Sequence, residues 1–198
     1  MDVAVPRLRH ILAPLVAVIA AFALGAPSTM AATCADTDVS ASDPAAADAT
    51  LCLLNKERTS RGLGTLTRSA VLDRAADRFA EDMVEREFFD HVSPGGGTFM
   101  DRIKAAGWTP SGAWTAGENI AWGSGSLATP ESIVDGWMHS AGHRANILNG
   151  AFTQIGIGIA DGAPQDGVRG KAGTYVNDFT GGGTKKRAAK RARRATKR

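Results

Sequence analysis

The residues best suited to chemistry in this chain are two histidines and a glutamate that lie far apart in the sequence. His91 lies in the segment FFDHVSP, just after a predicted helix end, and His143 lies in the turn segment SAGHRAN. Glu118 lies in AGENIAW, where flanking apolar residues predict a strand. Two imidazoles and a carboxylate suit a divalent-metal site or acid–base work. Their separations match no short metal motif, so an equally simple interpretation is histidines at helix ends and a glutamate that satisfies backbone amides.

The familiar catalytic signatures are missing from the sequence. Ser93 lies two residues from His91, so a Ser-His-Glu hydrolase with Glu118 is conceivable. However, no serine has glycine two residues before it and two residues after it, which excludes a nucleophile elbow. No His-Glu-x-x-His motif occurs, and this excludes the main zinc-protease signature.

Helices are predicted in the first half of the chain. One begins at Ser42-Asp43-Pro44 and is ended by Gly62. A clearer helix runs from Ser69 to near Arg86, because apolar residues recur on one side at three- and four-residue spacing. That side consists of Leu72, Ala75, Ala76, Phe79, Ala80 and Met83. His91 therefore follows the end of an amphipathic helix.

Two further helices are predicted before the strands. Thr98 and Asp101 have the spacing of a capping box, which opens a short helix that Gly107 ends. Thr129, followed by Pro130, caps a fourth helix. His139 lies on this helix, and we interpret it as a surface or packing residue. The apolar side of this fourth helix holds Ile133, Val134, Trp137 and Met138.

The pattern then changes from helical to strand periodicity. Residues 154–160 alternate isoleucine with glycine, and the glycine side allows another element to pack very close. Residues 174–179 and 118–122 are two further strand candidates. Helices followed by antiparallel strands predict an α+β fold, with helices stacked on a small sheet.

The N-terminal segment is typical of a secretory signal peptide. Arg7 and Arg9 precede an uncharged apolar run of 14 residues at 11–24, and small residues follow up to Ala32. A membrane-spanning helix needs about 20 apolar residues, so a permanent anchor is the poorer interpretation. We therefore expect 1–32 to be removed and the protein to be secreted.

The two cysteines, Cys34 and Cys52, both fall in the part expected to be exported. An oxidising compartment allows them to form one disulfide. Closing this loop would stabilise the fold by about 3 kcal/mol in the chain-entropy model. The disulfide would tie the N-terminal segment 33–48 to the first helix.

The net charge of +3 conceals an acidic body and a basic tail. Residues 185–198 contain nine Lys or Arg and no acid, whereas 1–184 hold 14 basic and 20 acidic residues. The tail is either an arm that binds anionic polymers or a membrane surface, or a solvated segment without a dedicated partner. Nucleic acid is the least favoured partner, because the chain has no reading motif and no aromatic residues within the tail.

Four motifs occur in a fixed order in the chain: FFDHVSP at 88–94, GENIA at 117–121, WMHSAGHRANIL at 137–148 and IGIG at 155–158. In these motifs the chain resembles the bacterial branch of the CAP superfamily, the SCP-like extracellular proteins related to cysteine-rich secretory, antigen 5 and pathogenesis-related proteins. The second and third motifs are the most specific. The resemblance covers about 50–180.

The resemblance implies an α-β-α sandwich with a small central antiparallel sheet, and a cleft that contains two histidines and two acidic residues. Carried over by motif, His91, Glu118 and His143 occupy three of those four positions. Ser140 stands where animal members have the second acid, which argues against a four-residue mechanism. Some family members are thought to bind metal in this cleft. We accordingly expect His91 and His143 to bind zinc or magnesium weakly, with Glu118 orienting a histidine or a water.

The resulting domain plan has four parts: a signal peptide at 1–32, a disulfide-tied segment at 33–48, a CAP domain at 49–180, and a glycine hinge with a disordered basic tail at 181–198. Trp108, Trp114 and Trp122 lie in glycine-rich segments, where aromatic side chains form a lipid or glycan platform or, for Trp122, pack in the core.

The sequence therefore predicts a secreted, monomeric binding module for an apolar or amphipathic (lipid-like or sterol-like) ligand or an envelope polymer. Its His/Glu cleft needs no cofactor but is able to take a divalent metal. The alternative is an extracellular hydrolase of peptide or glycan that uses a metal or the His/Glu cleft. The missing second acid and nucleophile favour the binding module.

Overall fold

A four-stranded sheet lies at the centre of the fold, with strand order β1-β3-β4-β2. The strands are β1 (Thr67–Arg68), β2 (Trp114–Ser124), β3 (Gln154–Asp161) and β4 (Ala172–Gly182). The three long strands are antiparallel to their neighbours, as predicted, whereas the two-residue β1 pairs in parallel with β3 and was not predicted. The computed structural model describes residues 34, 35, 37, 38, 40–110 and 112–182.

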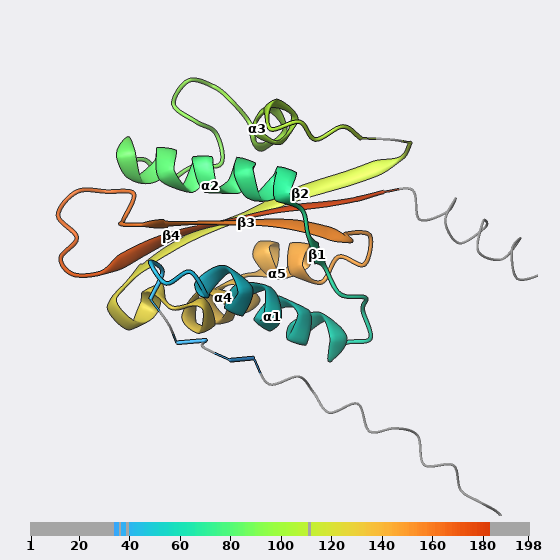
Figure 1. Ribbon diagram of the computed structural model, residues 1–198, viewed down its shortest axis with the longest axis horizontal. Helices are drawn as coiled ribbons and strands as arrows, with labels where there is room; N and C mark the ends of the chain where they lie inside the picture. The colour runs from blue at the N-terminus through green and yellow to red at the C-terminus, as the bar shows by residue number, and fades with distance from the viewer. Residues whose placement is uncertain (1–33, 36, 39, 111, 183–198) are drawn as a thin grey trace, which may run out of the picture. The chain divides into compact units, whose positions relative to one another are not determined.

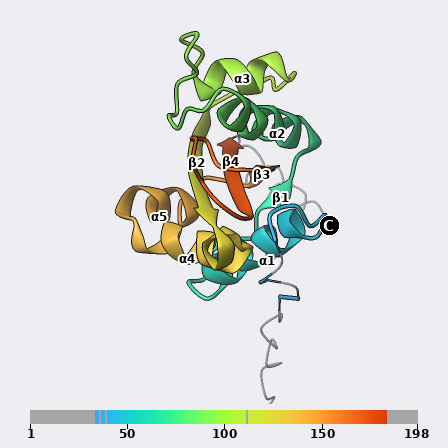
Figure 2. The same ribbon diagram turned by 90° about the vertical axis from the view of Figure 1, so that its left-hand side faces the viewer.

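Helices cover both faces of this sheet, so the structure confirms the α-β-α sandwich (Figure 1). Figure 2 shows α2 and α3 on one face and α1, α4 and α5 on the other. A short 3₁₀ helix, η1, joins β2 to α4. The bounds are α1 (Ala46–Thr59), α2 (Ala70–Glu85), α3 (Phe99–Ala105), η1 (Gly125–Ala128), α4 (Pro130–His139) and α5 (Ala141–Ile147).

Glycines on β3 allow α2 to pack directly on the sheet. A Cβ atom at Gly156 would overlap the backbone of Leu72, and one at Gly158 would overlap the backbone of Ala76. The apolar side of α2 is fully buried here, and Phe79 is 1% exposed. The glycine side of β3 therefore allows close packing, as predicted, because α2 lies directly against it. The isoleucines face the opposite helix layer.

Most of the predicted helix boundaries agree with the structure. The side chains and backbones of Thr98 and Asp101 form the predicted capping box of α3, and the Thr129 hydroxyl accepts a hydrogen bond from the Ser132 amide at the start of α4. The first helix begins at Ala46 rather than at Ser42, because the Asp43 carboxylate accepts the Ala45 N–H in a turn.

Two expectations about loops are corrected. His143 lies on a separate helix, α5, because the backbone of Ser140 is extended (φ −98°, ψ 121°) and divides α4 from α5. Gly181 and Gly182 end strand β4, paired with Thr115 and Trp114, rather than forming a hinge. The predicted signal peptide and the basic tail lie outside the described residues.

The two cysteines form the expected disulfide. Cys34 is bonded to Cys52 on α1. The bond ties the chain that precedes α1 to the helix, as proposed for the segment 33–48. Among the described residues, no helix has the length and apolar character that crossing a membrane requires.

Candidate functional site

The structure joins two of the three predicted site residues directly. Glu118 lies on β2 with its side chain only 1% exposed, and His91 lies in the loop after α2. The His91 Nδ1 atom is 2.7 Å from Glu118 Oε1. This hydrogen bond is the largest cause of a raised pKa at His91, because a carboxylate partner favours the imidazolium form.

Arg102 is a site residue that the sequence analysis missed. Its Nη2 atom lies 2.5 Å from Glu118 Oε2, so Glu118 contacts two cationic groups at once. Nη1 of Arg102 also donates to the carbonyl oxygens of His91 and Gly97, and its guanidinium lies 3.2 Å from the centre of the Phe79 ring. Arg102 therefore fixes both the carboxylate and the loop that carries His91. The sequence marks Arg102 only by its position on the short predicted helix that follows the FFDHVSP segment.

A second acid, Asp178, lies beside Glu118. The two residues are directly opposite each other on β4 and β2, and Asp178 is 1% exposed. Burial raises the pKa of Asp178 well above its usual value, and the neighbouring Glu118 carboxylate adds to this effect. The raised pKa favours the neutral form of the Asp178 carboxyl, which reduces the repulsion between two adjacent buried acids.

His143 reaches the same region from the other face of the sheet. The His143 carbonyl accepts a hydrogen bond from Asn119 Nδ2. Asn146 donates to the Glu118 carbonyl at 3.1 Å and to Asn119 Oδ1 at 2.9 Å. Asn119 and Asn146 thus hold α5 against β2.

The pKa values of the two histidines are shifted from the ordinary histidine value in opposite directions. Burial lowers the pKa of His143, and the charge of His91 lowers it further. His143 is therefore the neutral imidazole and His91 the one that carries a proton more readily.

An open apolar hollow of about 420 Å³ borders this site. Two large side chains at its rim are exposed, Phe89 at 44% and Leu127 at 66%. His143 and Ser140 are among the polar residues of its lining. The remaining residues of the lining are Ile120, Ala121, Trp122, Ser132, Ile133, Gly136 and Trp137. Trp122 therefore lies on strand β2, in agreement with the strand predicted at 118–122, and borders an apolar hollow.

The donor atoms of the site suit zinc better than magnesium. Both carboxylate oxygens of Glu118 are engaged, one by His91 and one by Arg102, so the direct ligands would be the His91 and His143 imidazoles. Magnesium requires oxygen ligands, whereas imidazole binds zinc well. Within the described part of the chain, no group of three or more His, Cys, Asp or Glu residues is placed to hold a metal ion.

His139 lies outside the site, as predicted from its position on the fourth helix. Its side chain is 78% exposed, and its Nδ1 atom lies 2.9 Å from the Asp135 carbonyl oxygen, one helical turn back.

The sandwich fold agrees with what the sequence motifs implied. Residues 51–177 match the CAP family, the cysteine-rich secretory protein family. The chain belongs to this family.

Two curated relatives come from Bacillus subtilis strain 168. The uncharacterized protein YkwD is 40% identical over 136 residues, which are 69% of this chain and 51% of YkwD. The uncharacterized membrane protein YlbC is 34% identical over 109 residues, 55% of this chain and 30% of YlbC. The chain thus spans about half the length of YkwD and less of YlbC.

Solved structures show the same fold. An extracellular protein of Bacillus anthracis that contains an SCP domain has 30% sequence identity and a TM-score of 0.54, over 67% of this chain and 39% of that protein. An outer surface protein of Borrelia burgdorferi has 19% identity and a TM-score of 0.52, over 65% of this chain and 86% of that chain. The Borrelia protein supports the fold alone.

Proposed function

We propose that this CAP-domain chain is a secreted binding module whose cleft holds an amphipathic anion. Three observations support the extracellular part of the proposal: the signal-peptide pattern at 1–32, the disulfide between Cys34 and Cys52, and the likeness to an extracellular SCP-domain protein of Bacillus anthracis. Disulfides persist in oxidising compartments, which agrees with export.

One observation carries the ligand class. The apolar hollow shares strand β2 with the charged group, since Ile120 and Trp122 line it while Glu118, on the same strand, pairs with His91 and Arg102. Two basic side chains, His91 and Arg102, contact Glu118. The pKa of His91 is raised by Glu118, and burial raises the pKa of the neighbouring Asp178, so both shifts favour positive charge in this group. An apolar chain in the hollow would therefore place an anionic head group near the two histidines.

Laurate is a suitable probe of this proposal, because it has an apolar chain and a carboxylate. Calorimetry should show laurate binding that weakens about tenfold or more in a Phe89→Ser/Leu127→Ser double variant, since both side chains are exposed at the rim of the hollow. Val92→Ser is the matched control, because Val92 is 45% exposed but is not part of the lining.

The head group is tested by reversing its charge. Dodecyltrimethylammonium has a chain of similar length and a cationic head, and we expect it to bind at least tenfold more weakly than laurate. Equal affinity of the two amphiphiles, or equal laurate affinity in the double variant and the wild-type chain, would contradict the proposal.

In the same site we propose a weak zinc site made by His91 and His143. Glu118 would orient the His91 ring through Nδ1, as carboxylates do for metal-binding histidines. The lowered pKa of His143 keeps its imidazole in the neutral form that binds metal. Zinc titration should give binding that the His91→Ala/His143→Ala variant abolishes; zinc binding unchanged in that variant would remove the metal from the proposal.

One observation favours a hydrolase as the second candidate function. His91 and His143 have pKa values shifted apart, which is the arrangement of an acid and a base in one site. Release of soluble fragments from peptidoglycan or from a peptide by the wild-type chain, abolished by Glu118→Gln, would decide for this candidate.

A further inference from the structure

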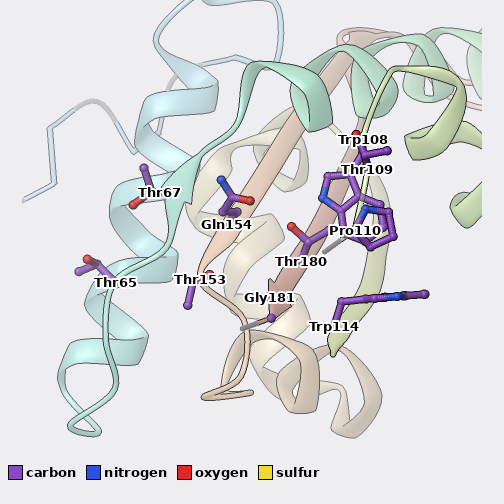
Figure 3. A pocket seen from close by; sticks show the side chains of 11 residues that line it. Thr65, Thr67, Trp108, Thr109, Pro110, Trp114, Thr153, Gln154, Thr180 and Gly181 are labelled. Atoms are coloured by element: carbon purple, nitrogen blue, oxygen red, sulfur yellow. The ribbon is translucent and has the colours of Figure 1, made fainter. Parts of the chain in front are cut away.

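A second hollow, of about 510 Å³, lies at the end of the sheet where β2 begins and β4 ends. We call it the tryptophan groove, and its lining differs entirely from that of the apolar hollow beside the histidines. Figure 3 shows Gln154 and Thr180 between Thr65 and Thr67 on one side and Trp108, Pro110 and Trp114 on the other. The full lining is Thr65, Thr67, Trp108, Thr109, Pro110, Trp114, Thr153, Gln154, Thr180, Gly181 and Gly182.

The floor of the tryptophan groove is a row of polar side chains that crosses three strands. Thr67 of β1 pairs with Gln154 of β3, and Gln154 pairs with Thr180 of β4. Directly paired residues share a face of the sheet, so all three side chains are on one face. Helix α2 covers the sheet from Gly156 onward, where it contacts Leu72, and does not extend over this last row.

Thr180 carries an unused hydrogen-bonding group in this row. The residue is 1% exposed, and its Oγ1 atom has no hydrogen-bond partner among the described residues. A buried hydroxyl without a partner costs about 1–3 kcal/mol, so such groups are ordinarily satisfied by a ligand or a water. Thr180 is part of the groove lining, and its Oγ1 atom is a buried, unpartnered polar atom directly at this site.

Two tryptophans form the wall of the groove. The Trp108 and Trp114 rings meet edge to face, with centroids 5.4 Å apart and planes at 82°. Trp108 packs against the core group of Leu72, Ala75 and Ile103, which holds the pair in place. Trp114 is 45% exposed, so the wall presents a large apolar ring to solvent next to hydroxyl and amide groups.

Among the residues that the structure describes, none with an ionisable side chain lines the groove. This lining argues against an anionic or cationic ligand, because a charged group would find no partner there. Hydroxyl and amide groups both donate and accept hydrogen bonds, as the hydroxyls of a sugar do. An indole ring packs on the C–H face of a sugar ring. We propose that the tryptophan groove binds a neutral oligosaccharide, a site separate from the amphiphile cleft.

The experiment titrates the purified chain with three neutral hexasaccharides: cellohexaose, maltohexaose and hexa-N-acetylchitohexaose. Tryptophan fluorescence and saturation-transfer NMR report binding. We expect at least one of them to bind, with an affinity that does not change between low salt and about 0.5 M salt, because a neutral ligand leaves the basic tail without effect. Trp114→Ala should weaken this binding about tenfold or more.

Gln154→Ala is the second variant, and it keeps the test valid if Trp114→Ala does not fold, because Gln154 is exposed at the strand end. It should weaken binding several-fold. Leu127→Ser is the matched control: it alters the amphiphile cleft and should leave oligosaccharide binding unchanged. The proposal is overturned if no hexasaccharide binds at about 5 mM, or if both groove variants bind as the wild type does.

Discussion

The Nδ1 atom of His91 lies 2.7 Å from Oε1 of Glu118, and this contact joins a half-exposed imidazole to a carboxylate that is 1% exposed. The carboxylate is buried together with Arg102, whose guanidinium contacts its other oxygen. The Glu118 carboxyl group, which raises the pKa of His91, is therefore held inside the protein, while the His91 imidazole is half-exposed at the surface.

In the Glu118→Gln variant, the pKa values of His91 and His143 should lie closer together than in the wild type. The amide keeps the shape of the side chain but removes the charge, so the pKa of His91 should fall toward its ordinary value. The pKa of His143 should rise slightly, since the charge of His91 contributes to its lowering. NMR titration of the imidazole C–H signals in the presence of a chelator measures both. Asp135→Asn, near His139, is the control and should change neither value.

The stabilisation of the fold by His91 should be greatest at low pH and should decrease as the pH rises. Its folded-state pKa is raised, so the folded protein binds the proton more tightly than the unfolded chain. The stabilisation is complete below the unfolded value of about 6.5 and is lost as the pH rises through the higher folded value. Urea unfolding of the wild type and of His91→Gln should therefore give the largest difference near pH 5. A difference that grows toward pH 9 would contradict this assignment.

Asp178→Asn should stabilise the protein at neutral pH. The folded-state pKa of Asp178 is raised by burial, so the wild type loses stability as the pH rises from the unfolded value toward the folded one. Asparagine is nearly isosteric with the neutral carboxyl and has no charge to desolvate. We expect a gain on the order of 1–2 kcal/mol at pH 8 and little change at pH 3, measured by urea unfolding. Loss of stability at pH 8 would show that Asp178 is ionised in the folded state.

Helices and capping signals could be predicted from the sequence because their causes are local. The apolar spacing from Leu72 to Met83 defines α2, and the Thr98 and Asp101 side chains form the cap of α3 a few residues apart. The break at Ser140 was missed, because α4 and α5 are separated by the backbone of a single residue rather than by a glycine or proline.

The candidate site could be predicted only in part, because its members meet through strand register. His91, Glu118 and His143 were found by their motifs, whereas Arg102 and Asp178 have no such signal. Asp178 reaches Glu118 only because β4 pairs with β2 at that position. A shift of one residue in this pairing would place Asn177 opposite Glu118 and turn the Asp178 side chain to the other face of the sheet. Nothing in the sequence of either strand alone specifies the register.

Arg58→Met should destabilise the protein strongly, although Arg58 is not part of any proposed site. Arg58 is 1% exposed, and its guanidinium donates hydrogen bonds to the carbonyl oxygens of Gly64, Ile147, Asn149 and Phe152. Removing it leaves these buried acceptors unsatisfied, so we expect a loss of about 3 kcal/mol or more in urea unfolding. Arg61→Met is the control. Its side chain is 39% exposed, and its change should stay within about 0.5 kcal/mol.

Gly158→Ala tests whether the cleft depends on the close packing of α2 on the sheet. An added methyl group at Gly158 would overlap the backbone of Ala76, and a backbone is unable to move aside as a side chain does, so we expect a loss of about 3 kcal/mol or more. The helix would have to move away from β3 together with Phe79, on whose ring Arg102 packs. Gly136→Ala is the matched control, because a Cβ atom there meets nothing within 4 Å and alanine is favoured in a helix by about 0.5–1 kcal/mol. If Gly158→Ala were as stable as Gly136→Ala, the helix would not be in direct contact with the sheet, and the position of Arg102 would need another explanation.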